Sequence, residues 1–256
     1  MNKFVKTLAS SIEIFSEHPK FIIPKLIIAV FYSITLLWTV DLTADAILAP
    51  SSEIIVSLLV LLAGTLIVGV LDIIASSMYP FMVEQTKKGK ISIKKALDLS
   101  LKKSMEIIPS VLVVEFIFLG LAVVLFIPFF FLAYFFGDFF ILIFYLIYAV
   151  FLFLVVFLFY SIYPVLAFEK NSLIGSLKRT IDLSMNNKRD VTKATGISFV
   201  ISMLSFAIAF VIEFIPQQEG TIFFWLAFII VRFLTAYVYS YLYVLNPVFY
   251  LEYGKK

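Results

Sequence analysis

Hydrophobic residues occupy six long runs that are separated by short polar stretches. Each run is about 20 residues or longer, the length that an α-helix needs to cross a hydrocarbon core about 30 Å thick. The apolar residues are continuous rather than alternating, and a backbone in lipid must satisfy its polar groups within a helix or a closed barrel. The pattern therefore predicts six transmembrane helices, at 21–40, 54–78, 107–133, 139–163, 195–215 and 221–245.

Three of the polar stretches have a helical pattern of their own, with apolar residues recurring every three or four positions. These positions are Phe4, Leu8, Ile12 and Phe15, then Ile93, Leu97, Leu101 and Ile108, then Leu173, Leu177, Ile181 and Met185. Each stretch also carries one serine in register: Ser11, Ser100 and Ser184. The pattern is typical of helices that lie in the membrane interface and direct basic residues towards anionic headgroups. The predicted headgroup-facing residues are Lys94, Lys95, Lys102, Lys103, Lys178 and Arg179.

A proline followed by a glutamate recurs after the second, fourth and sixth runs. The copies are Tyr79, Pro80 and Glu84, then Tyr163, Pro164 and Glu169, then Pro247 and Glu252. Proline biases the residue before it away from helix, so we expect each copy to lie where a returning helix reaches the interface. The two tyrosines are read as interfacial anchors or as binding residues, and the three glutamates as a salt-bridged rim.

These features predict an all-α polytopic membrane protein with six transmembrane helices in three parallel repeats. Each repeat has an interfacial amphipathic helix and a transmembrane hairpin, with approximate bounds 1–90, 91–172 and 173–256. Because each repeat contains two spans, all three have the same orientation, related by an axis along the membrane normal.

Composition and charge place the whole chain in the membrane and orient it. Hydrophobic residues make up 62% and charged residues 14% of the 256 residues, far from the 25% or so of charged residues in soluble domains. A single integral membrane domain at 1–256 is predicted. All but one of the 20 Lys and Arg residues lie at the termini, in the connections on one side, or at the start of the first span; the exception is Arg232. Basic loops stay inside, so we expect a multi-pass cell-membrane protein with both termini cytoplasmic.

Several functional classes are disfavoured by what the sequence lacks. It has no cysteine, which removes thiolate nucleophiles and cysteine-ligated metals, and one histidine, so any His-containing triad would have to use His18. No catalytic residue, metal site or cofactor is predicted. The basic residues lie against the membrane, where the negative charge of the inner leaflet accounts for them, so membrane lipids with anionic headgroups are the expected partners and nucleic acid is not. A protein partner or an oligomer remains open.

Four ionisable residues lie within or at the ends of the predicted spans: Asp72, Glu115, Glu213 and Arg232. Such residues usually face the bundle interior and mark either a paired structural contact or a pathway. An unpaired arginine in lipid is costly, so we expect Arg232 to pair with Asp72 or Glu115.

Three passages carry a resemblance to a known family: "FSEHPKFIIPKL", "YPVLAFEKNSLIGSLKRTIDLS" and "NPVFYLE". In these the chain resembles uncharacterised prokaryotic six-helix membrane proteins, which include the membrane domain joined to some glycerophosphodiester phosphodiesterases. The resemblance implies the fold and the location but not that activity, because the chain has no phosphodiesterase domain. Mitochondrial carriers also have three two-span repeats, but their Pro-x-acid-x-x-base motif is absent here.

Two function classes remain. The favoured one is a non-catalytic membrane scaffold that organises lipid or partners through its interfacial helices. The alternative is a transporter or channel for a small molecule, lipid or ion, with a polar site at the repeat interface. A packed or lipid-filled interior would favour the scaffold and a water-accessible polar cavity would favour transport; a lipid-modifying enzyme is a more distant third.

Overall fold

The computed structural model describes residues 3–48, 52–137, 139–211 and 222–254, and within these ranges side chains 36–48, 52–58, 206, 208–211 and 222–225 are outside the description. Every regular element in this described part is a helix. In chain order they are α1 (Lys3–Glu17), η1 (Pro19–Phe21), α2 (Ile22–Leu48), α3 (Ser52–Thr86), α4 (Ile93–Lys102), α5 (Ser104–Phe136), α6 (Phe139–Leu158), α7 (Ile162–Phe168), α8 (Leu173–Asn186), α9 (Lys188–Val211) and α10 (Ile222–Tyr253).

Four stretches of the described chain are helical, long and apolar enough to cross a membrane. They are Leu59–Thr86, Ser104–Phe136, Phe139–Phe168 and Leu226–Tyr253, and they coincide with the second, third, fourth and sixth predicted spans. The first and fifth predicted spans fall on α2 and α9, whose side chains are described only in part. The all-helical fold class is confirmed, and the four stretches are consistent with a multi-pass membrane protein.

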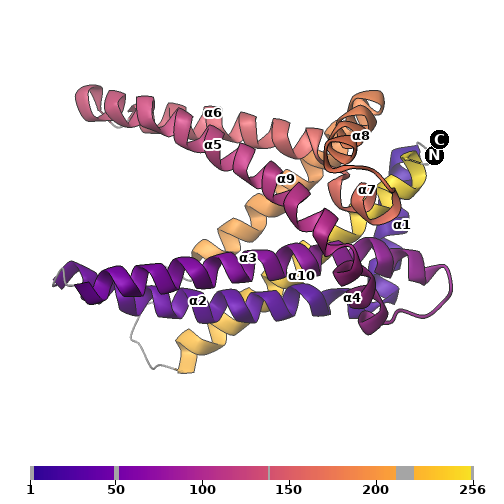
Figure 1. Cartoon of the computed structure of the whole chain (residues 1–256), viewed down its shortest axis with the longest axis horizontal. Helices are drawn as coiled ribbons and strands as arrows, with labels where there is room; N and C mark the ends of the chain where they lie inside the picture. The colour runs from indigo at the N-terminus through magenta and orange to yellow at the C-terminus, as the bar shows by residue number, and fades with distance from the viewer. Residues whose placement is uncertain (1–2, 49–51, 138, 212–221, 255–256) are drawn as a thin grey trace.

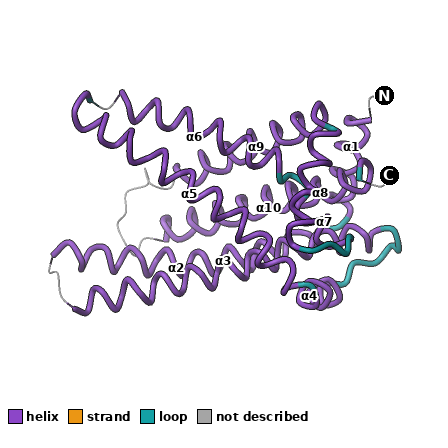
Figure 2. The backbone as a smooth tube through the Cα atoms, turned by 45° about the horizontal axis from the view of Figure 1, so that its top comes forward, coloured by secondary structure: helices purple, strands orange, loops and turns teal. Residues whose placement is uncertain are grey.

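The long helices form three antiparallel pairs that extend from a common end (Figure 1). The pairs are α2 with α3, α5 with α6, and α9 with α10. The shorter helices α1, α4, α7 and α8 gather at the common end together with both termini (Figures 1 and 2). The α5 and α6 pair diverges from α2 and α3 with distance from that end (Figure 1). The termini meet directly, since Lys3 Nζ donates to the carbonyl of Glu252 at 2.8 Å.

The main hydrophobic core lies at this common end. Phe21, Tyr79, Met82 and Val244 belong to one buried cluster that joins η1, α3 and α10. The α5 and α6 pair instead exposes large apolar side chains along its length, among them Phe116, Val124, Tyr134, Phe135 and Tyr145. Such an unburied apolar surface is expected of helices that face lipid.

The sequence predicted that each returning helix ends near its proline, and the structure shows otherwise at Pro80 and Pro247. Pro80 and Pro247 lie inside α3 and α10, which continue to Thr86 and Tyr253. Pro164 is the third residue of α7, just after a turn that separates α7 from α6. All three prolines are buried, and packing on the surrounding core offsets the helix bond that proline removes.

The helices α1, α4 and α8 pack on the bundle through small or hydroxyl-bearing residues together with a few large apolar ones. The buried small and hydroxyl-bearing positions include Thr7 and Ser11, then Ala96 and Ser100, then Thr180 and Ser184, and the buried large residues are Phe4 and Phe15 of α1 and Leu183 of α8. Ser11 Oγ lies 3.3 Å from the hydroxyl of Tyr241, Ser100 Oγ donates to the carbonyl of Ile74 at 3.0 Å, and Ser184 Oγ donates to the carbonyl of Leu158 at 3.2 Å. Each contacted residue stands six positions before Pro247, Pro80 or Pro164. The apolar residues Ile12, Leu97, Leu101 and Met185 remain exposed.

Candidate functional site

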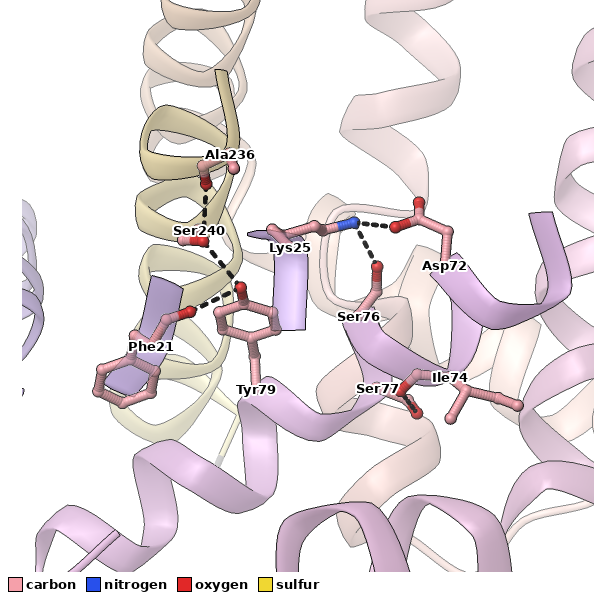
Figure 3. Close-up of polar contacts among 9 residues, drawn as sticks. All are labelled: Phe21, Lys25, Asp72, Ile74, Ser76, Ser77, Tyr79, Ala236 and Ser240. Atoms are coloured by element: carbon pink, nitrogen blue, oxygen red, sulfur yellow. Dashed lines mark hydrogen bonds and ion pairs between the residues drawn. The ribbon is translucent and has the colours of Figure 1, made fainter. Parts of the chain in front are cut away.

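A set of buried polar contacts lies beside the hydrophobic core, where η1, α3 and α10 meet (Figure 3). The hydroxyl of Tyr79, which is fully buried, donates to the carbonyl of Phe21 at 2.8 Å and lies 2.9 Å from Ser240 Oγ. Ser240 in turn donates to the carbonyl of Ala236. Tyr79 therefore joins η1, α3 and α10, and the predicted role of interfacial anchor is wrong for this residue because its ring and hydroxyl are both inside the protein.

Beside these contacts, Lys25 of α2 forms an ion pair with Asp72 of α3 (Figure 3). Lys25 Nζ lies 2.6 Å from Asp72 Oδ1 and donates to Ser76 Oγ at 2.8 Å. It also lies 3.9 Å from the centroid of the Tyr243 ring. The spacing of Asp72 and Ser76 puts both side chains on one face of α3. Since the side chain of Lys25 is only 7% exposed and that of Asp72 26%, the pair is largely withdrawn from solvent.

A cavity of about 540 Å³ lies beside this pair and is bounded by four helices. Its lining follows helical periodicity on α2 and α10, where positions three, four or seven apart share a face. The lining residues are Lys25, Ile28, Ala29, Tyr32 and Thr35 of α2, Thr65 and Asp72 of α3, Ser205 of α9, and Arg232, Thr235, Ala236, Tyr239 and Tyr243 of α10. The cavity thus combines three charged residues with hydroxyls, aromatic rings and small apolar side chains.

Arg232 lies in this cavity without the predicted carboxylate. Among the described residues no ion pair to Arg232 is present, and its buried Nε has no hydrogen-bond partner. Its guanidinium carbon lies 5.1 Å from the centroid of the Phe228 ring. The Oγ1 of Thr235, nearly one turn further along α10, is likewise buried without a partner in the described structure.

The predicted partners of Arg232 lie elsewhere. Asp72 is taken by Lys25, a residue that the sequence analysis had counted with the cytoplasmic charges at the start of the first span. Glu115 is an exposed residue on α5 and does not line the cavity. Glu213 lies outside the described residues. The structure therefore brings Asp72 and Arg232 to one cavity without pairing them.

The Lys25–Asp72 pair and Arg232 lie at different positions along the length of α10. Tyr243 and the ion pair above it mark one end, and Arg232 lies about 16 Å from Tyr243 along α10 at 1.5 Å per residue. The same count places Arg232 about 22 Å from Pro247. The cavity therefore has a neutralised end near the core and, further along α10, a cation that no described residue pairs with.

The three glutamates that end the predicted repeats are not equivalent. Glu169 accepts hydrogen bonds from Tyr250 at 2.8 Å, from Asn171 at 2.9 Å and from Arg179 at 3.0 Å. Burial alone would raise the pKa of the Glu169 carboxyl, but these hydrogen bonds outweigh it and hold the pKa below its ordinary value. Glu84 and Glu252 are exposed. The salt bridge expected of this rim is present at Glu169.

Two of the residues predicted to face headgroups are instead bound to the protein. Lys103 Nζ donates to the carbonyls of Leu166 and Glu169, which lie at the end of α7, where a cation interacts favourably with the helix dipole. Arg179 donates to Glu169 and to the carbonyl of Gly254. The other four, Lys94, Lys95, Lys102 and Lys178, are exposed.

Most of the residues that line the cavity were not predicted from the sequence. Tyr32, Thr35, Thr65, Tyr239 and Tyr243 were not singled out, although polar side chains recur at helical spacing within apolar runs. That spacing is the signal that could have found them. No group of three or more His, Asp and Glu residues in the described chain is arranged to hold a metal ion.

Comparison with protein-family models, with curated proteins and with solved structures finds no match to this chain. The resemblance to the six-helix prokaryotic family therefore stays a prediction.

Proposed function

We propose that this protein binds a small molecule within the membrane, in the cavity between α2, α3, α9 and α10, and is a transporter or ligand-binding membrane protein rather than only a scaffold. The observation that carries the proposal is Arg232, a cation that lines a cavity of about 540 Å³ and has no ion-pair partner in the described structure. A protein interior retains an uncompensated charge at a cost. Within a membrane span such a charge is by default a functional-site hypothesis.

The proposal includes six transmembrane helices in three repeats. The serine contacts of α1, α4 and α8 support it, because Ser11, Ser100 and Ser184 each contact the position six residues before a repeat-ending proline. In this arrangement α4 packs on the return span of the first repeat and α8 on that of the second. α1 packs on α10 of the third repeat, which closes the ring.

The orientation proposed is that both termini and the basic end face the cytoplasm of a cell-membrane protein. The chain has no cysteine, so single cysteines can be labelled without background. In intact cells, an impermeant thiol reagent should label Ser51→Cys, which lies outside the described residues, and should not label Lys88→Cys. The opposite labelling pattern would invert the orientation.

Solvent access to the cavity tests the binding function. The thiolate, not the thiol, is the reactive form, so a cysteine in dry lipid or packed protein reacts slowly. In membranes, Ala29→Cys should react with a small neutral thiol reagent, as should the aqueous control Lys88→Cys. The lipid-facing control Val124→Cys, exposed by 67% on α5, should not. If Ala29→Cys were as unreactive as Val124→Cys, the cavity would not be a site open to solutes.

Association of α1, α4 and α8 with lipid is a second candidate function, and it is compatible with the first. Leu97 and Leu101 are exposed on α4 beside the exposed Lys94, Lys95 and Lys102, an arrangement suited to an interface with anionic headgroups. Each basic residue near such a surface contributes about 1 kcal/mol. Neutralising these three lysines should weaken binding to anionic liposomes, whereas neutralising Lys103, which is bound to α7 carbonyls, should have less effect on lipid binding.

A further inference from the structure

We propose that the ligand of the cavity is an organic anion with an apolar tail, and that its anionic group pairs with Arg232. This inference rests on the proposed binding function and names the class of ligand. Three of the lining residues are charged, and Lys25 and Asp72 neutralise each other at 2.6 Å. Arg232 therefore leaves the lining with one net positive charge, which favours an anion over a cation or a neutral molecule.

The donors around Arg232 fit a carboxylate or a phosphate group. A guanidinium presents a planar fork of N–H donors that matches both groups. Its Nε has no partner in the described structure, and neither has the hydroxyl of Thr235 three positions on. Because both residues line the cavity and positions three apart lie on the same face of a helix, an anionic group bound by the guanidinium lies on the side of α10 that carries Thr235.

The rest of the lining fits an apolar tail. Ile28, Ala29 and Ala236 supply apolar surface, and Tyr32 and Tyr239 supply aromatic rings with hydroxyls. The volume of about 540 Å³ falls within the range of sites for small organic ligands. Two sources could supply this chemistry: a free organic anion with its tail inside the cavity, or the headgroup of an anionic lipid whose chains lie outside.

Charge selectivity at a single cysteine tests the class of ligand separately from the existence of the site. Ala29→Cys in reconstituted vesicles is reacted with two thiosulfonate reagents of similar size, one ending in a sulfonate and one in a trimethylammonium. Each rate is divided by that of Lys88→Cys with the same reagent. The sulfonate should be favoured by roughly tenfold, as expected for one uncompensated charge about 10 Å further along the helices at 1.5 Å per residue in a partly screened site. Arg232→Gln should abolish this preference and Arg232→Lys should keep it.

The outcomes separate the two proposals. Equal normalised rates for both reagents would overturn the anion assignment while leaving an open cavity in place. No reaction with either reagent would overturn the binding function itself. Selectivity that persists in Arg232→Gln would also overturn the assignment, because the charge would then come from another residue.

A ligand series in the unchanged Arg232 background keeps the inference testable if Arg232→Gln does not fold. Decanoate should slow modification of Ala29→Cys by a neutral reagent, whereas decan-1-ol and acetate, which lack the charge or the tail, should not. Vesicles with phosphatidic acid are compared with vesicles of phosphatidylcholine alone. Protection by phosphatidic acid but not by decanoate would identify the lipid headgroup as the source, and protection by decanoate would identify a free anion. Equal protection by decanoate and decan-1-ol would overturn the inference.

Discussion

Removing either partner of the ion pair between Lys25 and Asp72 should cost at least as much stability as removing both charges together. Removing one partner of a buried pair leaves an uncompensated charge and costs about 3 to 5 kcal/mol, whereas replacing both with apolar residues is often close to neutral. Here the side chain of Lys25 is 7% exposed and that of Asp72 26%. The ammonium left in Asp72→Leu is therefore less exposed to solvent than the carboxylate left in Lys25→Met.

These exposures set the expected size of each effect. Asp72→Leu should lower the free energy of unfolding by about 3 kcal/mol, and Lys25→Met by about 2 kcal/mol because the remaining carboxylate borders the cavity. The double variant also loses the hydrogen bond to Ser76 and the contact with the Tyr243 ring. It should nevertheless cost only about 2 kcal/mol, which gives a coupling energy of about 3 kcal/mol.

The assay is reversible unfolding in mixed micelles, followed by circular dichroism as the denaturing detergent is increased. Asp98→Asn is the matched control, because Asp98 is an exposed carboxylate on α4 and its loss should change stability by less than about 0.5 kcal/mol. Losses that simply add in the double variant would show that Lys25 and Asp72 do not act as a pair. If the losses of Asp72 and Arg232 variants were instead non-additive, Asp72 would be paired with Arg232, as the sequence predicted.

Three other predictions concern the common end of the bundle. The pKa of Glu169 is held below its ordinary value of 4.5, so its stabilising contribution is present above 4.5 and is lost as the pH falls through the lower folded-state pKa. Glu169→Gln should thus melt earlier than the parent protein at neutral pH, with a gap that closes in acid, and a pH-independent gap would contradict the assignment. Tyr79→Phe should lower the free energy of unfolding by about 1 to 2 kcal/mol because two buried groups lose a partner, while Tyr134→Phe, at a residue 78% exposed, should have no measurable effect in the same micelle titration. Ser184→Ala should lower the free energy of unfolding by about 1 kcal/mol, because its hydrogen bond to the carbonyl of Leu158 is lost. The control is Ser16→Ala, at an exposed serine that bonds within its own helix. A loss in Ser184→Ala no larger than in this control would argue against the packing role.

The sequence predicted the helices well because membrane spans and amphipathic helices are set by local hydrophobic pattern. The four helical stretches that are long and apolar enough to cross a membrane, and the helices α1, α4 and α8, lie where the pattern predicted helices. The serine in register also proved informative, since Ser11, Ser100 and Ser184 all lie on buried faces. A repeated small residue on an otherwise variable helix marks the side that approaches a neighbour.

The candidate site was harder to predict because it depends on distances between helices. The sequence showed that Asp72 and Arg232 are costly in lipid, but not that Lys25 is closer to Asp72 than Arg232 is. Lys25 was assigned to the cytoplasmic side from its position at the start of a run, and its long side chain instead reaches a carboxylate one helix away. Tyr79 was misread for a related reason: a tyrosine next to a helix end is consistent with an interface or with a core, and only its contacts distinguish the two.

The most direct test of the cavity's function is native mass spectrometry of the protein released from its own membrane. The parent protein should retain a small molecule or a single lipid that survives delipidation, and Ala29→Trp, which places an indole in the cavity, should lose it. Ile127→Trp, at a position on α5 that is 51% exposed and does not line the cavity, should retain it. Equal retention in both variants, or no bound mass in the parent protein, would contradict a ligand site between α2, α3, α9 and α10.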